Sequence, residues 1–209
     1  KPHDAAAYGI EMARDVSRLM DHLSIPRAHV VGYSMGAEVL TMLLVSDPAR
    51  VASASLIAGA GRFPTRPTDG QHMEEEALEF VNFGVSPKLF LEQTPEGTPD
   101  PTIEELKAAA ASALADPSRD TQALAAFSRA RPARLVTAQQ IASLQVPTIG
   151  IAGTADPDLE SLKDLASLPP AVTLVAIKDA THARRGGLLG HILGDLNGLP
   201  HQQEQRSKS

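Results

Sequence analysis

The stretch VVGYSMGAEVL (residues 30–40) places a serine between two glycines, at the point where a strand pattern changes into a helix pattern. The preceding AHVVGY (28–33) is short and apolar, as in a buried strand, and AEVLTMLLVSDP (37–48) has the apolar period of a helix. The inner face of that helix is predicted to carry Val39, Leu40, Leu43 and Leu44. A strand, a tight turn and a helix, in this order, form the unit from which we predict the rest of the fold.

The serine in this turn is a candidate nucleophile. In Gly32-x-Ser34-x-Gly36, a sharp strand-to-helix turn would expose the Ser34 hydroxyl above the carboxyl end of the strand. We expect a side chain at either glycine to collide with the neighbouring strand or helix. The N–H of Met35 would begin the helix and donate to a developing oxyanion. The alternative is a glycine-rich turn whose serine only caps the helix.

Three further apolar segments predict the rest of the sheet. They are VASASLIAG (51–59), VPTIGIAG (146–153) and VTLVAIKD (172–179). Helices are predicted at 4–23 and 158–168, and one face of the first carries Met12, Val16, Leu19 and Leu23. Because nearly continuous apolar strands alternate with helices, we expect an α/β fold with a parallel sheet covered on both faces.

Residues 62–137 interrupt this alternation. They contain three helical stretches and no strand pattern, and the helix at 102–114 has a capping box formed by Thr102 and Glu105. We interpret this segment as a helical lid inserted between the second and third strands, with surface helices of no binding role as the alternative. Its aromatic residues predict either a small apolar substrate pocket or the packed interior of the lid. They are Phe80, Phe83, Phe90 and Phe127.

A serine hydroxyl needs a base to take its proton and a carboxylate to orient that base. Asp156 follows the third strand and His182 follows the fourth, so the chain order is serine, acid, histidine. Both residues are expected at the carboxyl edge of the sheet, where open parallel sheets build their sites. The sequence therefore predicts a catalytic triad of Ser34, Asp156 and His182.

Other residues compete for two of these roles. Asp158 is the alternative acid, whereas Asp179 is expected on the end of a strand and not across the site. The alternative bases are His191, in a predicted helix, and His201, in the tail. The alternative for His182 itself is an exposed loop histidine.

Composition argues against several classes of function. The net charge is −6 and the basic residues do not cluster, which argues against nucleic acid and anionic membranes as partners. The chain has no cysteine and no H-E-x-x-H motif, so we expect neither disulfides nor a metal. It has no apolar run near the length of about 18 residues that a membrane span needs. Residues 1–20 lack the pattern of a signal peptide, so a cytoplasmic protein is predicted.

These residues resemble the α/β-hydrolase superfamily, and most closely its serine esterase and lactonase-like branch. The matching motifs are Gly32-Tyr33-Ser34-Met35-Gly36, Gly153-Thr154-Ala155-Asp156-Pro157 and Ala180-Thr181-His182-Ala183. The resemblance implies Ser34 as nucleophile, Asp156 as acid, His182 as base and Met35 as one oxyanion donor. It also implies chemistry without a cofactor.

The chain differs from the family pattern at both ends. The family fold has about four strands before the segment where this chain begins, so the resemblance implies that the N-terminal strands and their oxyanion loop are lacking. The nucleophile strand would then be an edge strand able to pair with a second copy, which would give a homo-oligomer. The five glycines of 186–198 predict a weak last helix.

The predicted division of the chain follows from these points. It is a partial α/β-hydrolase core at 1–61 and 138–200, the lid at 62–137 and a disordered tail at 201–209.

The predicted function is hydrolysis of a small-molecule carboxylic ester or lactone through an acyl-enzyme. C–C bond hydrolysis and cofactor-free haloperoxidation use the same triad on this fold and stay open as chemistries. A ligand receptor on a hydrolase fold is a second hypothesis. A catalytically incompetent remnant is a third, because losing one oxyanion donor costs about 10²–10³ in rate.

Overall fold

The centre of the molecule is one sheet of four parallel strands in chain order. The strands are β1 (Ala28–Tyr33), β2 (Val51–Ile57), β3 (Thr148–Gly153) and β4 (Thr173–Ile177). The computed structural model describes residues 1–61, 73–87, 99–168 and 172–182. In register, Leu56 of β2 lies between Gly32 of β1 and Gly150 of β3. The predicted α/β class and parallel sheet are confirmed.

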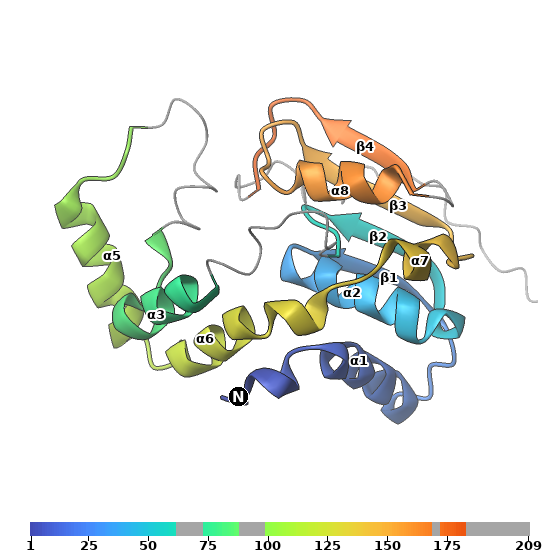
Figure 1. Cartoon of the computed structure of the whole chain (residues 1–209), viewed down its shortest axis with the longest axis horizontal. Helices are drawn as coiled ribbons and strands as arrows, with labels where there is room; N and C mark the ends of the chain where they lie inside the picture. Colours follow the sequence, from blue (N-terminus) through green and yellow to red (C-terminus); the bar gives the residue numbers. More distant parts are fainter. Residues whose placement is uncertain (62–72, 88–98, 169–171, 183–209) are drawn as a thin grey trace, which may run out of the picture.

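Helices connect the strands and pack along the sheet (Figure 1). They are α1 (Ile10–His22), α2 (Met35–Ser46), α7 (Ala138–Ala142) and α8 (Leu159–Ala166), with a short 3₁₀ turn, η2 (Pro48–Arg50), before β2. α2 packs against β1 and β2, α8 packs against β3 and β4, and α1 packs on α2. Within the described ranges, no helix is both long and apolar enough to cross a bilayer.

The hydrophobic core lies between the sheet and these helices. Its fully buried members include Leu40, Leu43 and Leu44 of α2, Leu56 of β2, and Leu162 and Leu165 of α8. The predicted inner face of the 37–48 helix is therefore confirmed, and Val39 packs against the same cluster. This packing fixes the carboxyl ends of the strands, where the candidate site lies.

The first predicted helix is shorter than expected, and it buries a different face from the one predicted. A 3₁₀ turn, η1 (Ala5–Ala7), precedes α1, and Gly9 separates the two; a Cβ on Gly9 would lie 3.1 Å from the Ala133 carbonyl oxygen. Ala13 and Met20 form the buried face of α1, whereas Leu19 is 56% exposed. The predicted face was thus wrong in its C-terminal half, where Met20 is the buried residue and Leu23, like Leu19, is exposed.

Among the described residues, one face of the sheet is partly exposed, and the coverage of this face by a helix stays a prediction. Side chains at alternate positions of β1 are exposed, and Val31 is 62% exposed. The same face of β4 exposes Val175. Among the described residues, β1 is an outer strand of the sheet, as predicted. Pairing with a second copy at that edge stays a prediction.

A helical region, residues 73–87 and 99–137, lies beside the sheet (Figure 1). It contains α3 (Met73–Phe83), α5 (Ile103–Ala115), α6 (Thr121–Arg129) and the 3₁₀ turn η4 (Arg131–Arg134). Its described residues include no strand, and the predicted Thr102–Glu105 capping box is confirmed. The division of the chain and the role of this region as a lid stay predictions.

Several predicted features lie outside the described residues. These are the helix at 186–198, the tail at 201–209, Phe90, His191 and His201.

Candidate active site

Ser34 occupies the turn between β1 and α2 in an uncommon backbone conformation. Its φ of +52° and ψ of −118° lie outside the regions that most residues adopt. Its N–H donates to the Ile57 carbonyl of β2 at 2.9 Å, and its own carbonyl accepts from the Ala37 N–H of α2 at 2.9 Å. The neighbouring strand and the following helix therefore fix the turn, and backbone strain of this kind collects at functional sites.

The two glycines of the turn are not equivalent. A Cβ on Gly32 would lie 2.3 Å from the Gly36 carbonyl oxygen, so only glycine allows this close approach of strand and helix. A Cβ on Gly36 would meet no described atom within 4 Å. The expectation that both glycines exclude a side chain was therefore wrong for Gly36, which lies inside α2 and faces open space.

Met35 lies where the sequence predicted an oxyanion donor. It is the first residue of α2 and directly follows Ser34. The first N–H groups of a helix have no acceptor within the helix, so this group is available to a ligand. An oxyanion at the helix N-terminus would also gain from the helix dipole.

The loops that carry Asp156 and His182 are joined through their backbones. Gly153 ends β3 against the loop after β4, where an added Cβ would lie 1.9 Å from the Ala180 carbonyl oxygen. The Ala155 N–H donates to that same oxygen at 3.1 Å. In addition, the Asp179 N–H donates to the Thr154 hydroxyl oxygen at 2.9 Å. These contacts hold the two loops in one fixed arrangement.

Ser34, His182 and Asp156 form a hydrogen-bonded series. Ser34 Oγ lies 2.9 Å from His182 Nε2, and His182 Nδ1 lies 3.1 Å from Asp156 Oδ1. His182 is 5% exposed, and the Asp156 side chain is fully buried. Because a carboxylate can only accept, Nδ1 carries the imidazole proton and Nε2 presents its lone pair to the Ser34 hydroxyl. The three residues that the sequence singled out are thus brought together.

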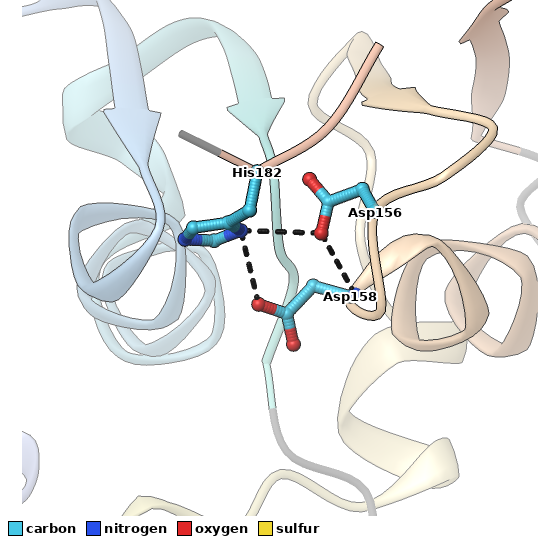
Figure 2. Close-up of side chains that lie close together, drawn as sticks. All are labelled: Asp156, Asp158 and His182. Carbon is cyan, nitrogen blue, oxygen red and sulfur yellow. Dashed lines mark hydrogen bonds and ion pairs between the residues drawn. The ribbon is translucent and has the colours of Figure 1, made fainter. Parts of the chain in front are cut away.

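Asp158 also contacts the imidazole. Its Oδ2 lies 3.4 Å from His182 Nδ1 (Figure 2), and its backbone N–H donates to Asp156 Oδ1 at 2.9 Å. The hydrogen bond to Asp156 raises the pKa of His182, burial opposes this, and the charges of Asp156 and Asp158 raise the pKa further. The base is therefore held by both aspartates that the sequence offered as alternatives.

Tyr33, which the sequence did not single out, also contacts the histidine. Its hydroxyl donates to the His182 carbonyl, and the two ring centroids are 5.7 Å apart. Burial raises the pKa of Tyr33, and the charges of Asp156 and Asp158 add to that rise. Its position inside the serine turn was the available signal, but the contact joins residues 149 positions apart. Sequence reasoning gives no access to such a pairing.

The same three side chains could reach one cation. One ligand atom each from Asp156, Asp158 and His182 lie within 4.8 Å of one another. One imidazole nitrogen and two carboxylate oxygens are a donor set that zinc accepts. Binding at Nδ1 would, however, require loss of the proton that joins His182 to Asp156. The arrangement is therefore the one expected of a base and its carboxylates.

The remaining candidates among the described residues are not part of this hydrogen-bonded series. Asp179 is exposed just beyond β4. Phe80 is buried in the helical region, and the Phe127 ring lies beneath the Arg134 guanidinium at 3.6 Å. Phe83 is exposed. These contacts favour the interpretation of the aromatic residues as packing residues of the helical region.

Comparison with known proteins places the chain among hydrolases. A family profile described as "alpha/beta hydrolase fold" matches residues 1–183. Est816, an N-acyl homoserine lactone degrading enzyme, superposes with a TM-score of 0.69 at 25% identity, over 96% of this chain and 77% of that one. The enol-lactonase from Burkholderia xenovorans LB400 superposes with a TM-score of 0.66 at 22% identity, over 92% of this chain and 74% of that one, and so shows the fold alone.

A curated relative matches a shorter stretch. Over 51 residues, the chain is 49% identical to the dihydrolipoyllysine-residue acetyltransferase component of the acetoin cleaving system of Pseudomonas putida. This stretch is 24% of the present chain and only 14% of that protein, so it carries no statement about the activity of the whole. The family profile, by contrast, spans the sheet, its helices and all the residues of the hydrogen-bonded series. The chain therefore belongs to the alpha/beta hydrolase fold family.

Proposed function

We propose that this chain is a serine hydrolase that cleaves a carboxylic ester or a lactone through an acyl-enzyme on Ser34. The observation that carries the proposal is the series Ser34–His182–Asp156, with contacts of 2.9 and 3.1 Å around a buried imidazole. The likeness to Est816 supports a lactone or a related ester as substrate, since that enzyme degrades a lactone and is 25% identical to this chain.

The first half of the reaction uses the histidine as a base. As Ser34 Oγ attacks the ester carbonyl, its proton passes to His182 Nε2, 2.9 Å away. The resulting imidazolium is stabilised by the Asp156 carboxylate on Nδ1. The carbonyl oxygen becomes an oxyanion, which the Met35 N–H would stabilise at the start of α2. Nε2 then returns the proton to the leaving alkoxide, which departs as an alcohol and leaves an acyl-serine.

The second half repeats these steps with water. His182 takes a proton from a water molecule, which attacks the acyl-serine, and the carboxylic acid leaves as Ser34 Oγ recovers a proton from Nε2. For a lactone, the alcohol and the acid are the two ends of one opened ring. Every proton in this cycle passes through His182 Nε2, and the nucleophile, the base and the oxyanion donor named here all belong to the chain.

The test of the proposal is covalent labelling of Ser34. Incubation with a fluorophosphonate probe should give one adduct in the intact mass of the wild-type chain and none in Ser34→Ala. Ser86→Ala is a matched control, because Ser86 is a buried serine of the helical region whose hydroxyl donates to a Glu79 carboxylate oxygen. A folded wild-type chain that gives no adduct would contradict the proposal and favour a remnant without activity.

Turnover separates an enzyme from a receptor that retains the same residues. The proposal expects many turnovers per chain on an activated ester or on a homoserine lactone. Labelling of Ser34 followed by a single stoichiometric burst would instead favour a ligand receptor on the hydrolase fold.

A further inference from the structure

Asp158 occupies a helix start but does not cap the helix. It is the N-cap residue of α8, a position where aspartate normally accepts a hydrogen bond from an N–H of the first turn. Here the side chain makes no such capping bond. Its carboxylate lies instead toward the imidazole of His182, beside Asp156 (Figure 2). Local helix stability therefore does not explain the orientation of this side chain.

The geometry gives Asp158 a contact on the imidazole atom that carries the proton. Its Oδ2 is 3.4 Å from His182 Nδ1, while Asp156 Oδ1 is 3.1 Å from the same nitrogen. The two carboxylates are also tied to each other, because the Asp158 N–H donates to Asp156 Oδ1. The Asp156 side chain is fully buried, whereas that of Asp158 is 47% exposed. The Nδ1–H of His182 thus faces two carboxylates, the buried one of Asp156 and the partly exposed one of Asp158.

We infer that Asp158 is a second positioning carboxylate for His182, so that two aspartates orient and stabilise the catalytic base where one would suffice. This inference rests on the proposed function, and it deepens it by naming a residue that acts through His182. Asp158 is not placed as a replacement for Asp156. It is an addition that would keep the proton on Nδ1 when Asp156 is lost.

The chemical consequence concerns the tautomer of the imidazole. An amide in place of the Asp156 carboxylate can donate a hydrogen bond and so favour the wrong tautomer, a change that costs about 10⁴ in rate in a triad with one acid. With Asp158 still facing Nδ1, the productive tautomer should persist. Loss of Asp156 alone should therefore cost less than it does in a triad with one acid.

A second consequence concerns pH. The titratable side chains placed against His182 in the described structure are Asp156 and Asp158 from the β3–α8 loop and Tyr33 from the end of β1. Lys178 and Asp179, in its own loop, are exposed. A negative charge on Asp158 favours the imidazolium and raises the pKa of His182. The base works only when neutral, so its activity falls as the pH drops through that pKa. Removing the charge should therefore move this fall to lower pH.

The experiment compares four variants of the full chain over a pH series of kcat/KM on an activated ester. We expect Asp158→Asn to lower kcat/KM by about threefold and to move the acid limb of the profile to lower pH, as a weakened charge-assisted contact should. Asp156→Asn should lower kcat/KM by about 10². The double variant should lower kcat/KM by about 10⁴, which is the loss seen when a triad has no acid. Asp164→Asn, which removes one carboxylate from the same helix, is the matched control and should keep the wild-type profile.

The inference is overturned by either of two results. One is an Asp156→Asn variant that already loses as much as the double variant, so that Asp158 contributes nothing in its absence. The other is an Asp158→Asn variant whose acid limb coincides with that of the wild type. A purely structural role of Asp158 would lower the amount of folded protein without moving the limb.

An NMR titration separates failure of this inference from failure of the proposed function. The ring protons of His182, assigned by their loss in His182→Gln, report its pKa whether or not the chain turns over. A pKa that falls in Asp158→Asn and not in Asp164→Asn supports the second carboxylate even if no ester is hydrolysed. An unchanged pKa overturns it even in an active enzyme.

Discussion

The α/β core and the helical region are held in shape by different kinds of contact. In the core, backbone meets backbone, as where Gly32 lies against α2 and Gly153 against the loop that carries His182. In the helical region, charged side chains join the helices: Arg129 pairs with Glu74, and Arg131 pairs with Glu76. Backbone contacts fix positions closely, as the proposed chemistry requires, while an exposed ion pair such as Arg129–Glu74 allows adjustment.

The two regions meet at a buried cation. Arg134 of η4 is 1% exposed and pairs with Glu38 of α2 at 3.0 Å. Its guanidinium also donates to the Phe127 carbonyl and lies over the ring of that residue. The helical region is therefore fastened directly to the helix that follows Ser34. Substitutions in the α/β core, in the helical region and at the Arg134–Glu38 contact between them should test whether the two regions are held in shape by different kinds of contact.

The largest effect is expected from the hydrogen-bonded series in the core. Ser34→Ala and His182→Ala should each lower kcat on an activated ester by about 10⁴–10⁶, and the double variant should be no worse, because the residues act as a unit. Lys107→Met, in the exposed part of α5, is the control from the helical region and should keep wild-type kcat within about twofold, since exposed ion pairs contribute little. Wild-type turnover in either core variant would contradict the proposal that Ser34 is the nucleophile and His182 the base.

The next effect is expected at the joint and concerns stability. Arg134→Met removes the buried cation that pairs with the largely buried Glu38 carboxylate, which should lower the free energy of unfolding by about 3–5 kcal/mol. Arg129→Met breaks an exposed pair in the same region and should cost about 0–1 kcal/mol. Urea titration of the three proteins measures both values. Equal costs would mean that the joint is no stronger than the surface pairs, and that the two regions are not fastened as described.

A smaller effect is expected where the backbone of the core is tight. Gly32→Ala places a Cβ against the Gly36 carbonyl, so the turn must shift, and a displacement of the nucleophile by about 1 Å can cost about 10² in rate. Gly36→Ala meets open space inside α2 and should keep its activity, with a gain of up to about 1 kcal/mol in stability from helix propensity. Activity and unfolding curves of this pair decide whether the serine turn depends on one glycine or on two.

These contacts explain how much of the site the sequence could predict. Ser34, Asp156 and His182 each follow a strand of a parallel sheet, so the topology alone brings them to one edge. The contact of Asp158 with His182 depends instead on the distance between two loops, and the open space at Gly36 depends on how the neighbouring elements pack around α2. Local patterns do not contain those distances, which the packing of the whole core sets.

The same limit applies to helix faces and to the joint. The apolar period located α1 but misplaced its buried face, because the small Ala13 and not Leu19 lies against the core. In the helical region, the Thr102–Glu105 capping box is local and was predictable. The Arg134–Glu38 pair joins residues 96 positions apart, and nothing in either segment indicates the other.

The smallest effect is expected from Tyr33, whose side chain contacts the histidine loop in addition to the backbone contacts that hold this loop in the core. Tyr33→Phe keeps the ring beside His182 and removes the hydroxyl that donates to the His182 carbonyl. A hydrogen bond of this kind contributes about 0.5–1.5 kcal/mol, so we expect kcat to fall by about two- to tenfold while KM stays unchanged. Tyr8→Phe is the matched control: its hydroxyl also donates to a backbone carbonyl, that of Pro2, but far from the proposed site, so kcat should not change. Equal kcat values in the two variants would mean that backbone contacts alone position the histidine loop, and the contrast between the core and the helical region would then be sharper than the structure suggests.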